Sequence, residues 1–174
     1  MIRPMHMISG FLMAVVVAAV AVTLTADSPT TVQIRDDCDP ATFNAFGNAN
    51  GLGDICQGDG QTTFGDFIAE LQATHVAEKW RFNPDRMSEP RRIVAHNRGG
   101  ETHTFTKVEN FGGGVNTTLN ALSNNPIQAP ECLSAKFAAT QVAPGDNLDP
   151  GPVSGGDKFQ CCIHPWMRTT VRQR

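Results

Sequence analysis

Three potential metal ligands lie close together near the C-terminus of the chain. In the segment FQCCIHPWMR (residues 159–168), Cys161, His164 and Met167 follow one another at intervals of three residues. A thiolate, an imidazole and a thioether form a soft set of ligands that suits copper and suits calcium or magnesium poorly. Whatever the rest of the chain folds into, this segment is a candidate metal site.

A second histidine, added to Cys161, His164 and Met167, would give the ligand set of a blue-copper site. In a blue-copper site, two imidazoles and a thiolate bind copper in one plane and a thioether binds weakly on the axis. The remaining histidines are His6, His75, His96 and His103. On the strand expected at residues 102–108, His103 and Phe105 share one face, as an inward ligand and a core residue would. We therefore select His103, and we interpret His96 as an outward-facing strand residue.

The N-terminus has the three-part layout of a secretory signal. Arg3 precedes an almost unbroken apolar run from Ile8 to Leu24, and small residues follow before Asp27. We predict that residues 1–26 are removed and that the protein is exported to the periplasm or secreted. An uncleaved membrane anchor is the alternative, although the run is just short of the ~20 residues that a span needs.

Composition and charge exclude one class of partner. The net charge of -3 argues against a nucleic-acid-binding protein, which would carry an excess of basic residues. The charge is also uneven, because residues 27–70 hold eight acidic side chains against Arg35 alone. Five cysteines in a chain of 174 residues favour an oxidising compartment or a metal site.

Residues 27–75 are expected to form an acidic N-terminal extension. The Gly-, Asp- and Asn-rich segment 36–61 has the composition of a loop, and Cys38 and Cys56 at its ends are expected to pair. Residues 63–74 begin with the capping-box form Thr-x-x-Asp and continue with apolar residues at helical spacing. We predict one short helix there.

Residues 76–174 are expected to form an all-β, Greek-key sandwich of two antiparallel sheets. Short runs of strand composition alternate with Pro and Gly: KWRFNP, RRIVAHN, THTFTKV, DKFQCC and RTTVRQ. The stretch 109–156 contains three consecutive glycines and several prolines, so we expect it to be mostly loop.

The C-terminal motif is similar to a known ligand loop. Cys161-x-x-His164-Pro165-Trp166-Met167-Arg168 resembles the short copper loop of amicyanin, a relative of plastocyanin. Asn97 lies six residues before His103, as a strand-ending asparagine does before the first copper histidine of those proteins. This resemblance covers roughly residues 76–174. It implies a cupredoxin fold, one type 1 copper ion held by His103, Cys161, His164 and Met167, and one-electron transfer.

The chain departs from that family at two threonines and at a second cysteine. Thr102 and Thr104 stand where relatives often have proline and asparagine, so a side-chain link between the ligand loops is in question. The Thr104 N–H can still reach the Cys161 sulfur. Strand alternation turns Cys162 away from a site that Cys161 faces, and we favour a disulfide between Cys162 and Cys132. The sequence alone leaves three pairings open among the four remaining cysteines. In an alternative explanation both adjacent cysteines form disulfides and the histidine binds nothing.

Three functions compete on this evidence. The leading one is an exported monomer that carries single electrons between redox proteins, which would dock transiently on an apolar patch around His164 and Trp166. The alternative is a periplasmic copper-binding or delivery protein, although the chain lacks Met- or His-rich tracts. An enzyme is disfavoured, because copper oxidases and reductases of this fold need His-x-His pairs, and the chain has none. Binding to nucleic acid, and membrane insertion after signal cleavage, are not expected.

Overall fold

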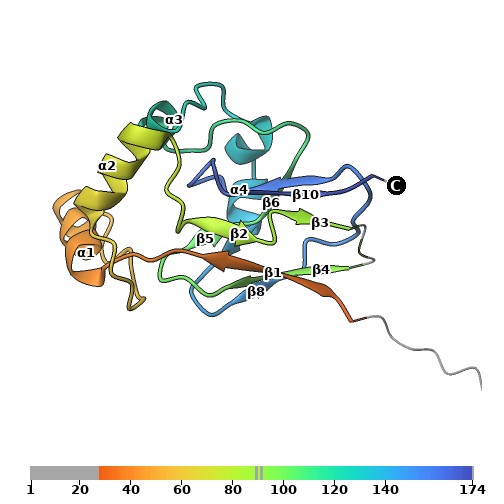
Figure 1. Cartoon of the computed structure of the whole chain (residues 1–174), viewed down its shortest axis with the longest axis horizontal. Coiled ribbons are helices and arrows are strands. Elements are labelled where there is room, and N and C mark those ends of the chain that lie inside the picture. The colour runs from red at the N-terminus through yellow and green to blue at the C-terminus, as the bar shows by residue number, and fades with distance from the viewer. Residues whose placement is uncertain (1–27, 89, 91, 174) are drawn as a thin grey trace, which may run out of the picture.

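The computed structural model describes residues 28–88, 90 and 92–173 (Figure 1). The proposed signal, residues 1–26, lies outside the described residues. One four-stranded sheet has the order β2-β1-β4-β8, built from Arg81–Asn83, Thr30–Arg35, Ile93–Asn97 and Asn147–Leu148. Strand β1 runs parallel to β4 and antiparallel to β2. Because β1 lies between them, part of the predicted N-terminal extension is an inner strand of this sheet.

Two further sheets are built from strands that lie between residues 86 and 171. The second has the order β3-β10-β9-β6, built from Arg86–Met87, Arg168–Val171, Lys158–Gln160 and Thr106–Val108. The third pairs β5 (His103–Thr104) with β7 (Gln141–Val142) in antiparallel register. Strands β9 and β10 are antiparallel neighbours, so the segment that joins them forms the connection of a hairpin.

Three of the described helices lie at one end of the molecule. The described helices are α1 (Pro40–Ala49), α2 (Phe64–Thr74), α3 (Thr117–Leu122), a 3-10 turn at Pro130–Leu133 and α4 (Lys136–Ala139). Figure 1 shows α1, α2 and α3 together beyond the ends of the strands. Helix α1 starts where the Asp39 carboxylate accepts a hydrogen bond from the Thr42 N–H at 3.0 Å. Helix α2 starts in the same way, with Thr63 Oγ1 accepting from the Asp66 N–H at 3.1 Å.

One apolar core joins the helices to the sheets. Phe105 and Phe159, from two different strand regions, stack with ring centroids 4.5 Å apart. At the helical end, Phe43 of α1 stacks on Trp80 at 5.7 Å and Phe67 of α2 contacts the same indole at 4.6 Å. All five side chains are buried within one cluster. We call residues 36–75, which hold α1 and α2, the helical cover.

The predicted all-β, Greek-key sandwich is wrong. About 24% of the described residues are helical and about 26% lie in strands, which form several small sheets with parallel as well as antiparallel pairs. The error arose in the segments read as loops. Residues 36–61 contain α1, and residues 109–156 contain α3, a 3-10 turn and α4. By contrast, the helix predicted at 63–74 is present as α2, Phe64–Thr74.

Both proposed disulfides are present. Cys38 bonds Cys56 across 18 residues, and Cys132 bonds Cys162 across 30, which leaves Cys161 as the free thiol. Two disulfides are typical of proteins from oxidising compartments, which agrees with export. Among the described residues, no helix is both long and apolar enough to cross a membrane.

Candidate metal centre

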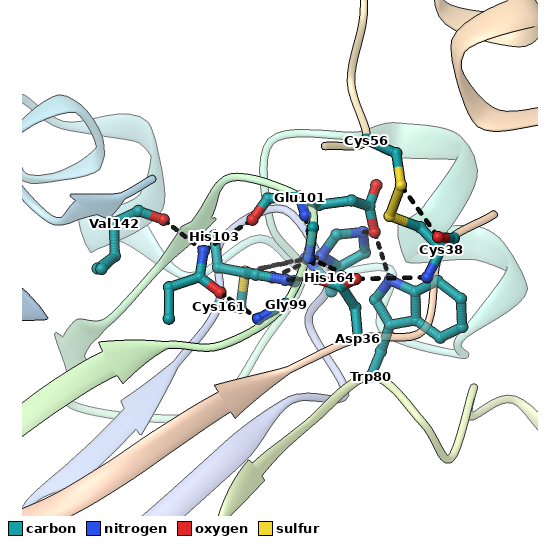
Figure 2. Close-up of polar contacts among 12 residues, drawn as sticks. Asp36, Cys38, Cys56, Trp80, Gly99, Glu101, His103, Val142, Cys161 and His164 are labelled. Atoms are coloured by element: carbon teal, nitrogen blue, oxygen red, sulfur yellow. Dashed lines mark hydrogen bonds and ion pairs between the residues drawn. A yellow bond between two sulfur atoms is a disulfide. The ribbon is translucent and has the colours of Figure 1, made fainter. Parts of the chain in front are cut away.

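Three of the predicted ligands converge in the interior. Cys161 Sγ lies 3.8 Å from His103 Nδ1 and 3.9 Å from His164 Nδ1, and the two nitrogens are 3.2 Å apart (Figure 2). Bonds of about 2.0–2.3 Å that meet at angles of about 100–130° around one ion span distances of this size. All three residues are buried, so this group could hold a metal ion away from water.

The hairpin connection between β9 and β10 shapes the ligand loop. The Cys161 N–H donates to the Met167 carbonyl at 3.0 Å, and the Met167 N–H donates to the His164 carbonyl at 2.9 Å. These two bonds close the loop on itself and point its side chains into the fold. Met167 is itself buried in the core cluster. Its backbone therefore belongs to the site, while a bond from its sulfur to a metal stays a prediction.

Asn97 positions the remote ligand, His103. It ends β4, and its side-chain amide donates to the carbonyls of Glu101 at 2.7 Å and Val142 at 2.8 Å. The amide oxygen accepts from the Gly99 N–H at 2.9 Å. Asn97 thus ties the turn before His103 to the partner strand β7.

The environment of the Cys161 sulfur favours the thiolate. The N–H groups of Thr104 and His164 point at Sγ from 3.4 and 3.5 Å. Burial alone would raise the pKa of Cys161, but hydrogen bonds and charge interactions with His103 and His164 outweigh it and hold the pKa well below its usual value. Metals bind the thiolate rather than the thiol, so the sulfur is prepared as a ligand.

The departure at Thr104 preserves the link between the ligand loops. Thr104 Oγ1 accepts a hydrogen bond from the Cys162 N–H at 2.7 Å, so a hydroxyl joins the two loops. Cys162 points away from the three ligands and is held by its disulfide to Cys132. The expectation from strand alternation is therefore confirmed.

Sequence reasoning missed the carboxylate behind His103. Asp36, directly after β1, accepts from His103 Nε2 at 2.8 Å, and both side chains are at most 1% exposed. Burial alone would raise the pKa of Asp36, but His103 and the N–H groups of Gly100 and Glu101 bring it below its ordinary value. Burial alone would likewise lower the pKa of His103, but Asp36 and Cys161 raise it to about 10. A carboxylate on Nε2 fixes the imidazole so that Nδ1 faces the site.

The helical cover lies over the second histidine. The His164 ring contacts Phe67 of α2 edge-on at 6.2 Å and Trp166 at 5.3 Å, and His164 is only 3% exposed. Its Nε2 lies 3.8 Å from a Glu101 carboxylate oxygen that also accepts from the Trp80 indole N–H. Burial is the main reason that the pKa of Glu101 is raised. The docking hypothesis required the His164 ring to reach the surface, and this part of it is wrong because the ring is buried.

The other two histidines that the structure describes lie outside the group. His96 is half-buried on β4, and the exposed His75 ends α2 and contacts the Leu122 carbonyl through Nδ1 at 2.8 Å. The two carboxylates beside the candidate ligands, Asp36 and Glu101, could not be recognised from the local sequence, because each is one acidic residue among many. The ends of the Cys38–Cys56 segment contact both of them: the Cys38 N–H donates to Asp36 Oδ1 at 3.3 Å, and Cys56 forms an isolated antiparallel bridge with Glu101.

Comparison with protein-family models, with curated proteins and with solved structures gives no match to this chain. The site must therefore be interpreted from its own residues and geometry.

Proposed function

We propose that this protein is an exported one-electron carrier that holds a single type 1 copper ion with His103, Cys161, His164 and an axial Met167. The observation that carries the proposal is the convergence of one thiolate and two imidazole Nδ1 atoms within 3.9 Å of one another in the interior. Copper bound there would supply the chemistry by alternating between Cu(II) and Cu(I). The donor set suits copper and excludes hard ions such as calcium.

The surrounding chain supports rapid electron transfer by keeping the ligands still. Cys161 is fixed by two N–H groups on its sulfur and by the loop-closing bond to Met167. His103 is fixed on both sides, by Asp36 at Nε2 and by the strand pair β5–β7. The disulfide at the neighbouring Cys162 restrains the loop further. Ligands that cannot move change little between oxidation states, which keeps the cost of each electron transfer low.

The similarity to amicyanin and plastocyanin lies in this arrangement. The ligand loop, the asparagine before the first histidine and the N–H group of Thr104 on the sulfur all have counterparts in that family. We infer kinship with the cupredoxins from these local features. The inference does not extend to the sheets, which are small and contain parallel as well as antiparallel pairs.

Burial of the site favours electron carriage over copper delivery. Delivery requires an ion that a partner can reach and remove, whereas the three ligands are almost completely enclosed. The half-buried Trp166 contacts the His164 ring at 5.3 Å, and its indole N–H donates to the Ala77 carbonyl at 3.2 Å. We propose that redox proteins dock transiently near it. Met167, which is buried in the same loop, would be the fourth residue to hold the ion.

Protein-film voltammetry of the copper-loaded protein tests the proposal. We expect one reversible one-electron couple, with copper retained in both oxidation states. His103→Gln should abolish this couple, while His96→Gln, the same change at a histidine outside the group, should leave it intact. Irreversible loss of copper on reduction would contradict the carrier role and favour delivery. A couple that survives in the His103 variant would contradict the ligand assignment.

A further inference from the structure

A cavity of about 440 Å³ lies between the helical cover and the metal-site region. Its walls include Phe46, Phe64 and Phe67 from the cover and Leu119 from α3, and it extends to His164 and Glu101. Ligand sites in proteins commonly have 300–1,000 Å³, mostly apolar walls and a few polar groups. The size and lining of this cavity therefore match those of a small-molecule site.

Glu101 supplies a polar group in the wall. One of its carboxylate oxygens, Oε2, accepts from Trp80 Nε1. Among the described residues, no hydrogen bond to the other oxygen, Oε1, is found, and the Glu101 side chain is 9% exposed. A carboxylate oxygen that has no protein donor, on a side chain that lines the cavity, favours a ligand that brings a hydrogen-bond donor.

Charge narrows the class of ligand further. Among the residues that line the cavity, Asp54 and Glu101 are acidic, and none is lysine or arginine. An anionic ligand would bring its charge towards these carboxylates, and His164, rather than a lysine or arginine, is the basic side chain in the described wall. The ring-lined walls favour a flat aromatic body, because aromatic rings pack well against one another at 4.5–7 Å.

We propose that this cavity binds a small, uncharged aromatic molecule that carries a hydroxyl group, that is, a phenol. The ring lies among the phenylalanines of the helical cover, and the hydroxyl donates a hydrogen bond to Glu101 Oε1. The bound ring then lies beside His164. This inference concerns binding alone and does not depend on which metal the site holds, or on whether it carries electrons.

Isothermal titration of the full mature protein, free of metal, with phenol tests the proposal. We expect a dissociation constant of about 1 mM or tighter, which is reasonable for so few ligand atoms. Toluene, which has the same shape without a donor, should bind at least fivefold more weakly. Benzoate, which has the same ring with a negative charge, should not bind measurably. Failure of phenol to bind at about 10 mM would overturn the proposal, as would equal binding of toluene or benzoate.

Variants at the cavity wall show whether phenol binds there. Phe46→Ala removes a ring that lines the cavity, and Leu52→Ala removes an aliphatic side chain from the wall; both positions are at least 36% exposed, so both variants should fold. We expect at least a fivefold loss of phenol affinity for the Phe46 variant and a smaller loss for the Leu52 variant. Ile127→Ala is the matched control, because Ile127 is 82% exposed and outside the cavity wall. Unchanged affinity in the Phe46 variant would overturn the assignment of this cavity.

Discussion

Replacement of Asn97 by alanine tests how strongly this residue holds the turn before His103. The Asn97 side chain is fully buried and donates to two backbone carbonyls, those of Glu101 and Val142. Alanine leaves both carbonyls without their donor and leaves the Gly99 N–H without its acceptor. Each buried group that loses its partner costs about 1–3 kcal/mol. Allowing for partial relaxation, we expect a loss of about 3 kcal/mol in the free energy of unfolding.

Urea unfolding at neutral pH measures this loss, with Asn48→Ala as the matched control. The Asn48 side chain donates to Asp54 at 2.9 Å on an exposed face, so its removal should change stability by at most about 0.5 kcal/mol. A second readout is copper affinity, which should fall in the Asn97 variant and stay unchanged in the Asn48 variant. A loss of stability below about 1 kcal/mol in the Asn97 variant, with copper affinity unchanged, would refute the view that Asn97 holds His103 in place.

Three further changes probe the core, the pH dependence and the link between the ligand loops. Phe105→Ala removes a fully buried ring that stacks on a neighbour at 4.5 Å, and should cost about 3–5 kcal/mol in urea unfolding; a cost below 1 kcal/mol would contradict the shared core. Burial tends to raise the pKa of Asp37, but Lys79 at 2.5 Å and other donors outweigh burial and lower the pKa. The ionised Asp37 therefore stabilises the fold above the unfolded-state pKa, and this stabilisation is lost as the pH falls through the lower folded-state pKa. Asp37→Asn should therefore lose less stability than the natural protein between pH 7 and pH 3, and equal losses would refute this. Thr104→Val leaves the buried Cys162 N–H without its acceptor and should cost about 1–3 kcal/mol, whereas unchanged thermal unfolding would show that the link is dispensable.

The loop that carries the candidate ligands could be predicted from the sequence because its geometry is local. Cys161, His164 and Met167 lie within one hairpin connection, where spacing alone limits how far apart they can be. His103 could be added because strand alternation decides which side chains face inward. The same alternation turned Cys162 away from the site and so favoured its disulfide with Cys132, although the sequence left three pairings open.

The helical cover could not be predicted because its composition misleads. Helix α1 has Gly47 in its interior, a residue that normally disfavours helices. Here glycine is required by packing: a Cβ on Gly47 would come within 2.2 Å of the Gly53 carbonyl oxygen. The many Gly, Asp and Asn residues around Gly47 led to the prediction of a loop. In the structure the segment forms a helix, whose buried Phe43 packs into the core.

The pairing of strands that lie far apart in the chain could not be predicted from the sequence either. Strand β1 pairs in parallel with β4, about 60 residues away, and this pairing brings Asp36 to His103. Local pattern shows that a segment can be a strand, but not which strand it joins. The carboxylates behind the candidate ligands, Asp36 and Glu101, depend on those pairings and were missed for that reason.

The visible absorption spectrum of the protein with Cu(II), recorded beside that of Cys161→Ser, tests the central claim most directly. If the Cys161 thiolate and two imidazoles bind copper, the natural protein has an intense blue thiolate-to-copper band, and the serine variant has none. Cys162 cannot replace the lost sulfur, because it is bonded to Cys132. Absence of the band from the natural protein, or its persistence in Cys161→Ser, would contradict a type 1 copper site at these residues.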